Sequence, residues 1–316
     1  MTATPVVLAL AELDNAVSGP LLGRLLLGIG VAVALAGLAA MSRPTDWYRR
    51  LTDRLLFGVP WGTLLLMAVL LAVYGGLQDG FGAADPIVLP FRAWSYLDPR
   101  GMLVAGVAHA NTSHLIGNLL GTLLFGSMAE SLWGHHTTRR TTTRLHAAWT
   151  HPVVRALIIF PAAGLLLSIL GALVALGPII GFSMVVFAFA GFALVHAPVL
   201  TILASVSQGV LRRLFDAIQT PQQVAASGTT YTTPWFASIA IQGHAVGLLV
   251  GVLLGLGYQR LTRRQRPSVG VLWLAVLLFA VERSLWAVYW YRGNNSYVLY
   301  RAVGLGLVFV LATVVT

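Results

Sequence analysis

The chain has 316 residues, of which 57% are hydrophobic and only 9% are charged, and its mean hydropathy is +0.81. A soluble globular protein of this size carries about a quarter of its residues as charged side chains, so this composition excludes a soluble domain. Apolar runs of about 20 residues, the length that crosses a bilayer as a helix, recur along the chain. We therefore predict an all-α polytopic membrane protein.

The net charge of +10 comes from 20 arginines and 10 acidic residues, with no lysine. The arginines cluster in short links between apolar runs, where the positive-inside bias places them, so we expect contact with the lipid bilayer and none with nucleic acid. The chain has no cysteine, which excludes disulfides and thiolate chemistry. The acidic residues Glu12 and Asp14 do not fit the basic start of a cleavable signal peptide.

Nine apolar runs are predicted to span the membrane. In chain order they cover 20–41, 56–77, 112–133, 153–176, 179–196, 199–214, 235–258, 268–290 and 297–316. The sixth run is the weakest, because Ser205, Ser207 and Gln208 interrupt it. The eighth is long enough only if it includes Glu282 and Arg283, which we expect to lie near an interface or to pair inside the bundle.

The arginine-rich links predict the orientation of the chain in the membrane. The links 43–54, 139–155 and 260–266 hold four arginines each and alternate with poorer links, so we expect them to be cytoplasmic. Nine spans then place the N-terminus outside and the C-terminus inside.

Three spans carry polar side chains, which are costly in lipid and usually functional. The third opens with His109, His114 and Asn118, the fifth carries Ser183, and the seventh carries His244. His114 and Asn118 are four residues apart and share a helix face, whereas His109 precedes the span. Alternate spans enter the membrane from the same side, so these polar groups are predicted to meet at one depth.

This set has the parts that a hydrolase needs. Ser183 would be the nucleophile, His244 the base that takes its proton, and His114, Asn118 and backbone N–H groups near Ser183 the donors to the oxyanion. No acidic residue near Ser183 or His244 in the sequence suggests itself as a third member, so we predict a Ser–His dyad.

Structural roles are the alternative for each of these residues. A serine in a spanning helix can bond to a carbonyl of its own helix, and a histidine can be hydrogen-bonded within a bundle. His109, His114 and Glu130 are residue types that bind metals, but no HExxH motif occurs and Glu130 lies about four turns further along. We therefore expect no metal. Glu130 is predicted to hold the third span to a neighbouring link, and the link 134–152 to be a solvated loop.

The motifs and their order resemble the rhomboid family of intramembrane serine proteases. The matching positions are His109, His114 and Asn118; Gly126, Glu130 and Gly134; Gly181 and Ser183; and His244, Gly247 and Gly251. The glycines of the seventh span also leave a bare face for close helix packing.

The resemblance implies a six-helix catalytic core over 56–258, an N-terminal extension 1–55 with one transmembrane helix, and a C-terminal extension 259–316 with two. It implies a multi-pass protein of the cell membrane that cleaves transmembrane protein substrates without a cofactor. Ser183 and His244 would form the dyad, and His114, Asn118 and the Ser183 amide the oxyanion hole. The site would open to the extracytoplasmic face, with 199–214 and 215–234 as the gate. The substrate and the oligomeric state stay open.

Two positions depart from the family pattern. Met184 stands where the family commonly has a glycine after the serine, and Phe91, Arg92 and Trp94 stand near the place of its usual Trp-Arg pair.

Two other functions are consistent with the sequence. One is a rhomboid-like protein that binds membrane clients without cutting them. The other is a transporter with a polar path, which inverted repeats would favour, and none is found.

Overall fold

The computed structural model describes residues 53–83, 85–136, 149–175, 178–219, 240–262, 266–293 and 296–316. The predicted first span, 20–41, and most of the link 215–234 lie outside these residues. The chain divides into two compact units, Met1–Arg50 with Gly209–Thr230 and Leu51–Gln208 with Tyr231–Thr316. The second unit contains almost all of the described helices and the whole candidate site.

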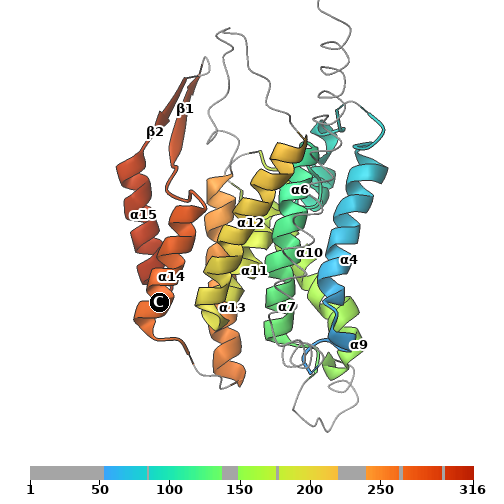
Figure 1. The fold of residues 1–316 in the computed structure, drawn as a ribbon. Coiled ribbons are helices and arrows are strands. Elements are labelled where there is room, and N and C mark those ends of the chain that lie inside the picture. The colour runs from blue at the N-terminus through green and yellow to red at the C-terminus, as the bar shows by residue number, and fades with distance from the viewer. Residues whose placement is uncertain are drawn as a thin grey trace, which may run out of the picture. The chain divides into compact units, whose positions relative to one another are not determined.

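The described chain is mostly helical (Figure 1). Among the described residues, three helical segments are long and apolar enough to cross a membrane, judged by length and composition: Thr112–Trp133, Pro152–Leu173 and Ile241–Thr262. The first comprises α6 (Thr112–Gly121), the π-helical turn η4 (Thr122–Gly126) and α7 (Ser127–Trp133). The second comprises α9 (Pro152–Val154), the π-helical turn η5 (Arg155–Ile159) and α10 (Phe160–Leu173), and the third is α13 (Ile241–Thr262). The prediction of a helical membrane protein is confirmed at this level.

Shorter elements complete the fold. They are η1 (Leu56–Gly58), α4 (Trp61–Ala72), the π-helical turn η2 (Val73–Leu77), η3 (Leu89–Phe91), α5 (Pro99–Val104), α11 (Ser183–His196), α12 (Pro198–Gln219), α14 (Val269–Glu282), β1 (Tyr289–Gly293), β2 (Ser296–Leu299) and α15 (Arg301–Val314).

Local sequence signals set several helix starts. The side chain of Asn111 accepts the His114 N–H at 2.8 Å before α6, and Ser268 caps α14 in the same way. Pro152 and Pro198 open α9 and α12, where the missing N–H of proline has no intrahelical role.

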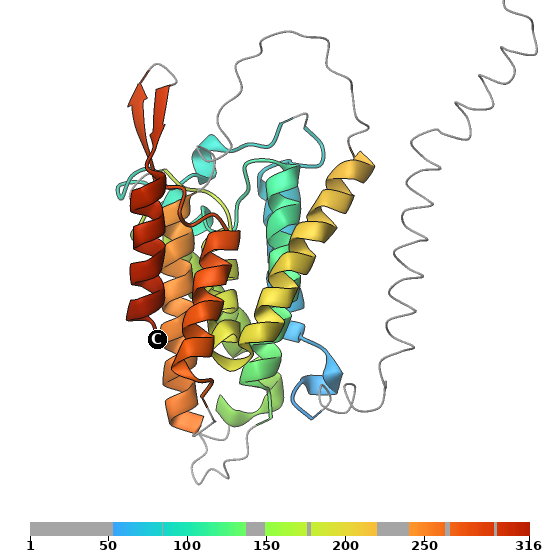
Figure 2. The same cartoon turned by 60° about the vertical axis from the view of Figure 1, so that its left-hand side comes forward.

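The predicted eighth span, 268–290, is wrong at its C-terminal end. Helix α14 ends at Glu282, and β1 and β2 then form an antiparallel hairpin with Trp290 opposite Val298. The hairpin projects beyond the ends of α14 and α15 (Figure 2). Its strands hold three tyrosines, one tryptophan and one valine, residue types that favour strands, and Gly293 and the following Asn294 are residue types common in tight hairpin turns. The final helix accordingly starts at Arg301 and not at 297.

Helix α11 lies in the core of the second unit, and most of its side chains are buried. It packs closely on α13 through Gly191, Gly247 and Gly251. A Cβ at these positions would overlap the carbonyl oxygens of Leu248, Met184 and Ala188, respectively. The predicted bare face of the seventh span is therefore a real helix contact, and it joins the helix of Ser183 to that of His244.

Candidate active site

The turn before α11 is held by backbone hydrogen bonds to the loop and helix end that precede α6. Ile179 and Ala93 exchange two N–H···O bonds of 3.0 Å, and the Gly181 N–H donates to the Ala105 carbonyl at 2.8 Å. Gly181 has a φ of +116°, which a residue with a side chain rarely adopts.

This turn makes Ser183 the first residue of α11. The predicted fifth span, 179–196, is therefore wrong at its start, because residues 179–182 form the turn. Ser183 lies at the helix end and is half-buried. The first N–H groups of a helix have no acceptor within it, so the amides of Ser183 and Met184 are free of intrahelical bonds.

His114 and Asn118 both reach the Gly181 turn, as their shared face predicted. A Cβ on Gly181 would lie 2.5 Å from His114 Cε1 and 3.4 Å from Asn118 Nδ2. The Asn118 Nδ2 group is buried and has no hydrogen-bond partner in the described part of the chain. Burying an unpaired donor is costly, so this amide is a candidate ligand-binding group.

His109 lies in the segment between α5 and α6, yet its ring packs edge-on against His114 with the centroids 5.2 Å apart. Gln78 fixes its backbone by donating to the His109 carbonyl and accepting the His109 N–H, both at 2.7 Å. Neither ring nitrogen of the fully buried His109 has a partner among the described residues. Burial, aided by His114, lowers the pKa of His109 to about 3. The ring is therefore neutral at physiological pH.

His244 lies on α13 and stacks on Phe187, with the ring centroids 4.3 Å apart and an interplanar angle of 11°. Phe187 follows Ser183 by four residues, so the imidazole lies one turn from the serine along the same face of α11. The structure has no hydrogen bond between Ser183 and His244, although both are described. His244 Nδ1 is buried without a partner in the described part of the chain.

Met184, the residue after Ser183, is buried. It packs on α10, where a Cβ on Gly171 would lie 2.5 Å from the Met184 sulfur. Its carbonyl faces Gly247 of α13. This methionine therefore fills a space that Gly171 leaves on α10.

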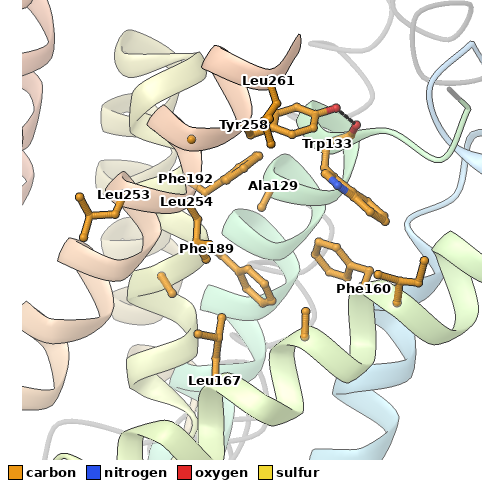
Figure 3. A pocket seen from close by; sticks show the side chains of 14 residues that line it. Ala129, Trp133, Phe160, Leu167, Phe189, Phe192, Leu253, Leu254, Tyr258 and Leu261 are labelled. Carbon is orange, nitrogen blue, oxygen red and sulfur yellow. Dashed lines mark hydrogen bonds between the residues drawn. The ribbon is translucent and has the colours of Figure 1, made fainter. Parts of the chain in front are cut away.

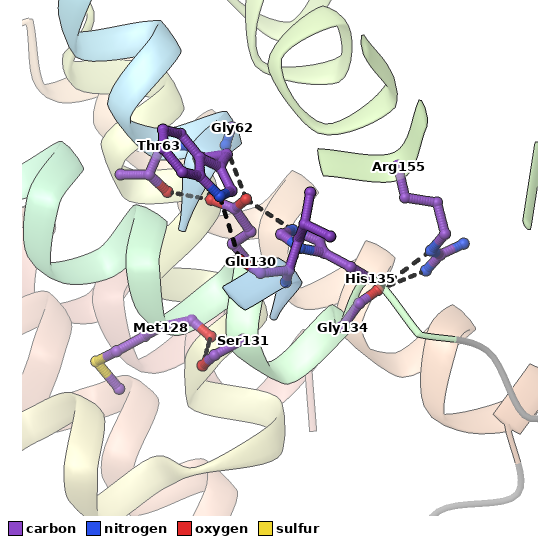
Figure 4. A network of polar contacts seen from close by, with 10 residues as sticks. Gly62, Thr63, Met128, Glu130, Ser131, Gly134, His135 and Arg155 are labelled. Atoms are coloured by element: carbon purple, nitrogen blue, oxygen red, sulfur yellow. Dashed lines mark hydrogen bonds and ion pairs between the residues drawn. The ribbon is translucent and has the colours of Figure 1, made fainter. Parts of the chain in front are cut away.

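Glu130 lies in α7, toward the other end of the third span from His114. It is the centre of a second network of polar contacts (Figure 4). Its carboxylate accepts the N–H groups of Gly62 and Thr63 at 2.8 Å and the Thr63 hydroxyl at 2.7 Å. These are orphan donors at the start of α4, so Glu130 caps that helix. Glu130 was predicted to hold the third span to a neighbouring link, but these three contacts are to the start of helix α4 instead. Gly126 packs on the same threonine.

His135 completes this centre, and the sequence prediction missed it. It is fully buried, donates from Nε2 to Glu130 at 2.8 Å and accepts the Leu56 N–H at Nδ1 at 2.8 Å. The prediction of a solvated link over 134–152 is wrong here. Gly134 has a φ of +79° and ends α7, and its carbonyl accepts two bonds from Arg155. The available signal in the sequence was that His135 follows Glu130 by five residues, directly after Gly134, which ends the helix.

Comparisons with protein-family models, curated proteins and solved structures find no match to this chain. In the part of the chain that the structure describes, no three His, Asp or Glu side chains gather as metal ligands. Functional inference therefore rests on the geometry around Gly181, Ser183 and His244.

Proposed function

We propose that this chain is a rhomboid-like intramembrane serine protease that cleaves transmembrane segments of other membrane proteins. The observation that carries the proposal is the meeting of His114 and the unpaired Asn118 amide at the Gly181 turn, two residues before a serine at a helix N-terminus. An oxyanion hole needs donors gathered beside the nucleophile, and these groups supply them.

The proposed reaction uses Ser183 and His244 as a dyad. His244 Nε2 takes the proton as Ser183 Oγ attacks the peptide carbonyl, and the Ser183 amide, His114 and Asn118 stabilise the oxyanion. His244 then protonates the leaving amine, and a water molecule hydrolyses the acyl-enzyme. The Ser183–His244 bond would form as substrate enters, because catalytic hydrogen bonds are often loose in an empty site.

Labelling with a fluorophosphonate tests the nucleophile directly. The purified chain in detergent should be labelled at Ser183 and should cleave a reconstituted model transmembrane substrate, whereas Ser183→Ala should lose both signals. Ser168→Ala is the matched control, since Ser168 is a buried serine of α10 that bonds to the Leu165 carbonyl. Asn118→Ala should retain folding and cleave about 10²-fold more slowly.

Cleavage that survives in Ser183→Ala would exclude this mechanism. A folded chain that binds the substrate but takes no label would instead support a client-binding protein without protease activity. The absence of a Ser183–His244 hydrogen bond is the observation that favours this second function.

A further inference from the structure

An apolar groove lies among α7, α10, α11 and α13, at the opposite ends of these helices from Ser183. Its volume is about 410 Å³, within the range of small-molecule sites. Aromatic rings form much of its wall (Figure 3): Trp133, Phe160, Phe189, Phe192 and Tyr258.

The aromatic wall is rigid. The Phe160 and Phe189 rings stack at 5.2 Å with an interplanar angle of 10°, and Trp133 packs on Phe160. The Tyr258 hydroxyl donates to the Trp133 carbonyl at 2.6 Å, which ties α13 to the end of α7. The Tyr258 hydroxyl is thereby hydrogen-bonded, and the groove offers an almost wholly apolar surface.

The groove opens on the outer surface of the helix bundle. Ala163 of α10 and Leu253, Leu254 and Leu261 of α13 line it and are exposed. These residues belong to two of the segments that are long and apolar enough to cross a membrane. In a bilayer such a surface meets acyl chains.

Apolar contact alone does not retain a lipid, because a lipid tail is as apolar as the groove. A retained lipid needs a polar anchor, and Arg155 is placed to provide one. Its guanidinium lies 3.6 Å from the Trp133 ring centroid, on a residue of the groove wall. Its Nε and Nη2 atoms donate to the Gly134 carbonyl. These are two of the five N–H donors that a guanidinium has. Arg260, which is exposed beside Leu261, adds positive charge at the same helix ends.

We infer that this groove binds the acyl chain of an anionic phospholipid, whose phosphate contacts Arg155. The aromatic wall holds the chain, and the planar guanidinium matches the phosphate oxygens. The site is separate from Ser183 and His244 and does not depend on the proposed protease activity.

Native mass spectrometry of the delipidated chain in detergent tests the site. Titration with phosphatidylglycerol should give one tightly retained lipid, with phosphatidylcholine at least tenfold weaker. Gly257→Leu should lower the retention of phosphatidylglycerol at least tenfold. Gly257 lines the groove and has open space at its Cβ, so leucine fills the groove without a clash. Gly270→Leu is the matched control, since Gly270 also has open space but lies on α14, outside the groove.

Three further variants make the test decisive. If Gly257→Leu does not fold, Ala163→Leu replaces it, with Ala162→Leu as its control, because both alanines are exposed on α10 and only Ala163 lines the groove. Arg155→Gln should reduce the preference for phosphatidylglycerol over phosphatidylcholine. Equal retention of both lipids by the unmodified chain, or undiminished retention in the filled-groove variants, would overturn the inference.

Discussion

At the scale of single residues, Gly181 decides the geometry of the candidate site. Its positive φ turns the chain so that Ser183 begins α11, and its missing side chain lets His114 and Asn118 approach. Met184 shows the complementary case, because its sulfur occupies a space that Gly171 leaves on α10. The absence of a side chain at Gly171 thus makes room for the Met184 side chain next to Ser183.

His109 gives a prediction about pH. Its folded pKa of about 3 lies below the value of 6.5 expected in the unfolded chain. Between these values the unfolded state binds the proton and the folded state does not, so the stability due to neutral His109 is present above pH 6.5 and is lost as the pH falls. Because of this single group, the unfolding free energy should be about 2 kcal/mol lower at pH 5 than at pH 7.5.

The measurement is thermal or denaturant unfolding in detergent at pH 7.5 and pH 5. His109→Phe should remove this part of the pH dependence, so the variant should lose less stability on acidification than the unmodified chain. Its stability at pH 7.5 should be little changed, because the ring nitrogens of His109 have no partner among the described residues. An identical pH dependence in both proteins would contradict the buried, neutral state.

At the scale of elements, Glu130 joins two helices by capping one with a side chain of the other. Glu130→Gln retains the shape of the side chain but replaces one carboxylate oxygen with an NH2 group. This group is a donor and would face the N–H and O–H donors of α4 or the N–H donor of His135. Leaving buried donors unpaired costs about 1–3 kcal/mol each, so we expect a loss of about 3 kcal/mol in unfolding free energy. Thr63→Val removes a single hydroxyl from the same network and should cost about 1 kcal/mol. Equal losses in the two variants would show that Glu130 is not the centre of the network.

The sequence predicted helices well where periodicity or polar spacing constrained them. The third span starts and ends as predicted, at 112 and 133, because Asn111 caps its start and Gly134 ends it. The approach of His114 and Asn118 to one turn also followed from their spacing. The start of α11, the β1–β2 hairpin and the burial of His135 did not follow. The turn before α11 depends on Ala93 and Ala105, and the burial of His135 depends on Glu130, so both features need tertiary partners that the sequence does not show. The hairpin is local, but its aromatic and apolar residues also continue the apolar pattern of a span, which hid it.

At the scale of the whole molecule, α14 belongs to the same core as the candidate site, although it follows the segment predicted as the catalytic core. Phe279 of α14 packs edge-on against both Phe125 and Phe187, and Phe187 carries the stacked His244 ring. The C-terminal region after Tyr231 also falls in one compact unit with Leu51–Gln208. The final helices are therefore coupled to the helices that carry Ser183 and His244.

The polar contact of α14 with α12 makes this coupling testable. Glu282 and Arg283 form an ion pair of 2.8 Å, which agrees with pairing, one of the two arrangements expected from the sequence. Arg283 also donates to the Ser205 hydroxyl and carbonyl. Arg283→Met should lower the unfolding free energy by about 1–2 kcal/mol, because it removes charged hydrogen bonds and leaves Glu282 without its cation. Glu282→Gln combined with Arg283→Met should recover part of that loss.

Arg301→Met is the control, since Arg301 is an exposed arginine at the start of α15. Thermal unfolding in detergent measures all three variants against the unmodified chain. A loss in Arg283→Met no larger than in Arg301→Met would mean that α14 is held to the bundle by its apolar face alone. A larger loss, partly restored in the double variant, would show that the pair on α14 fixes α12 through Ser205, as the contacts require.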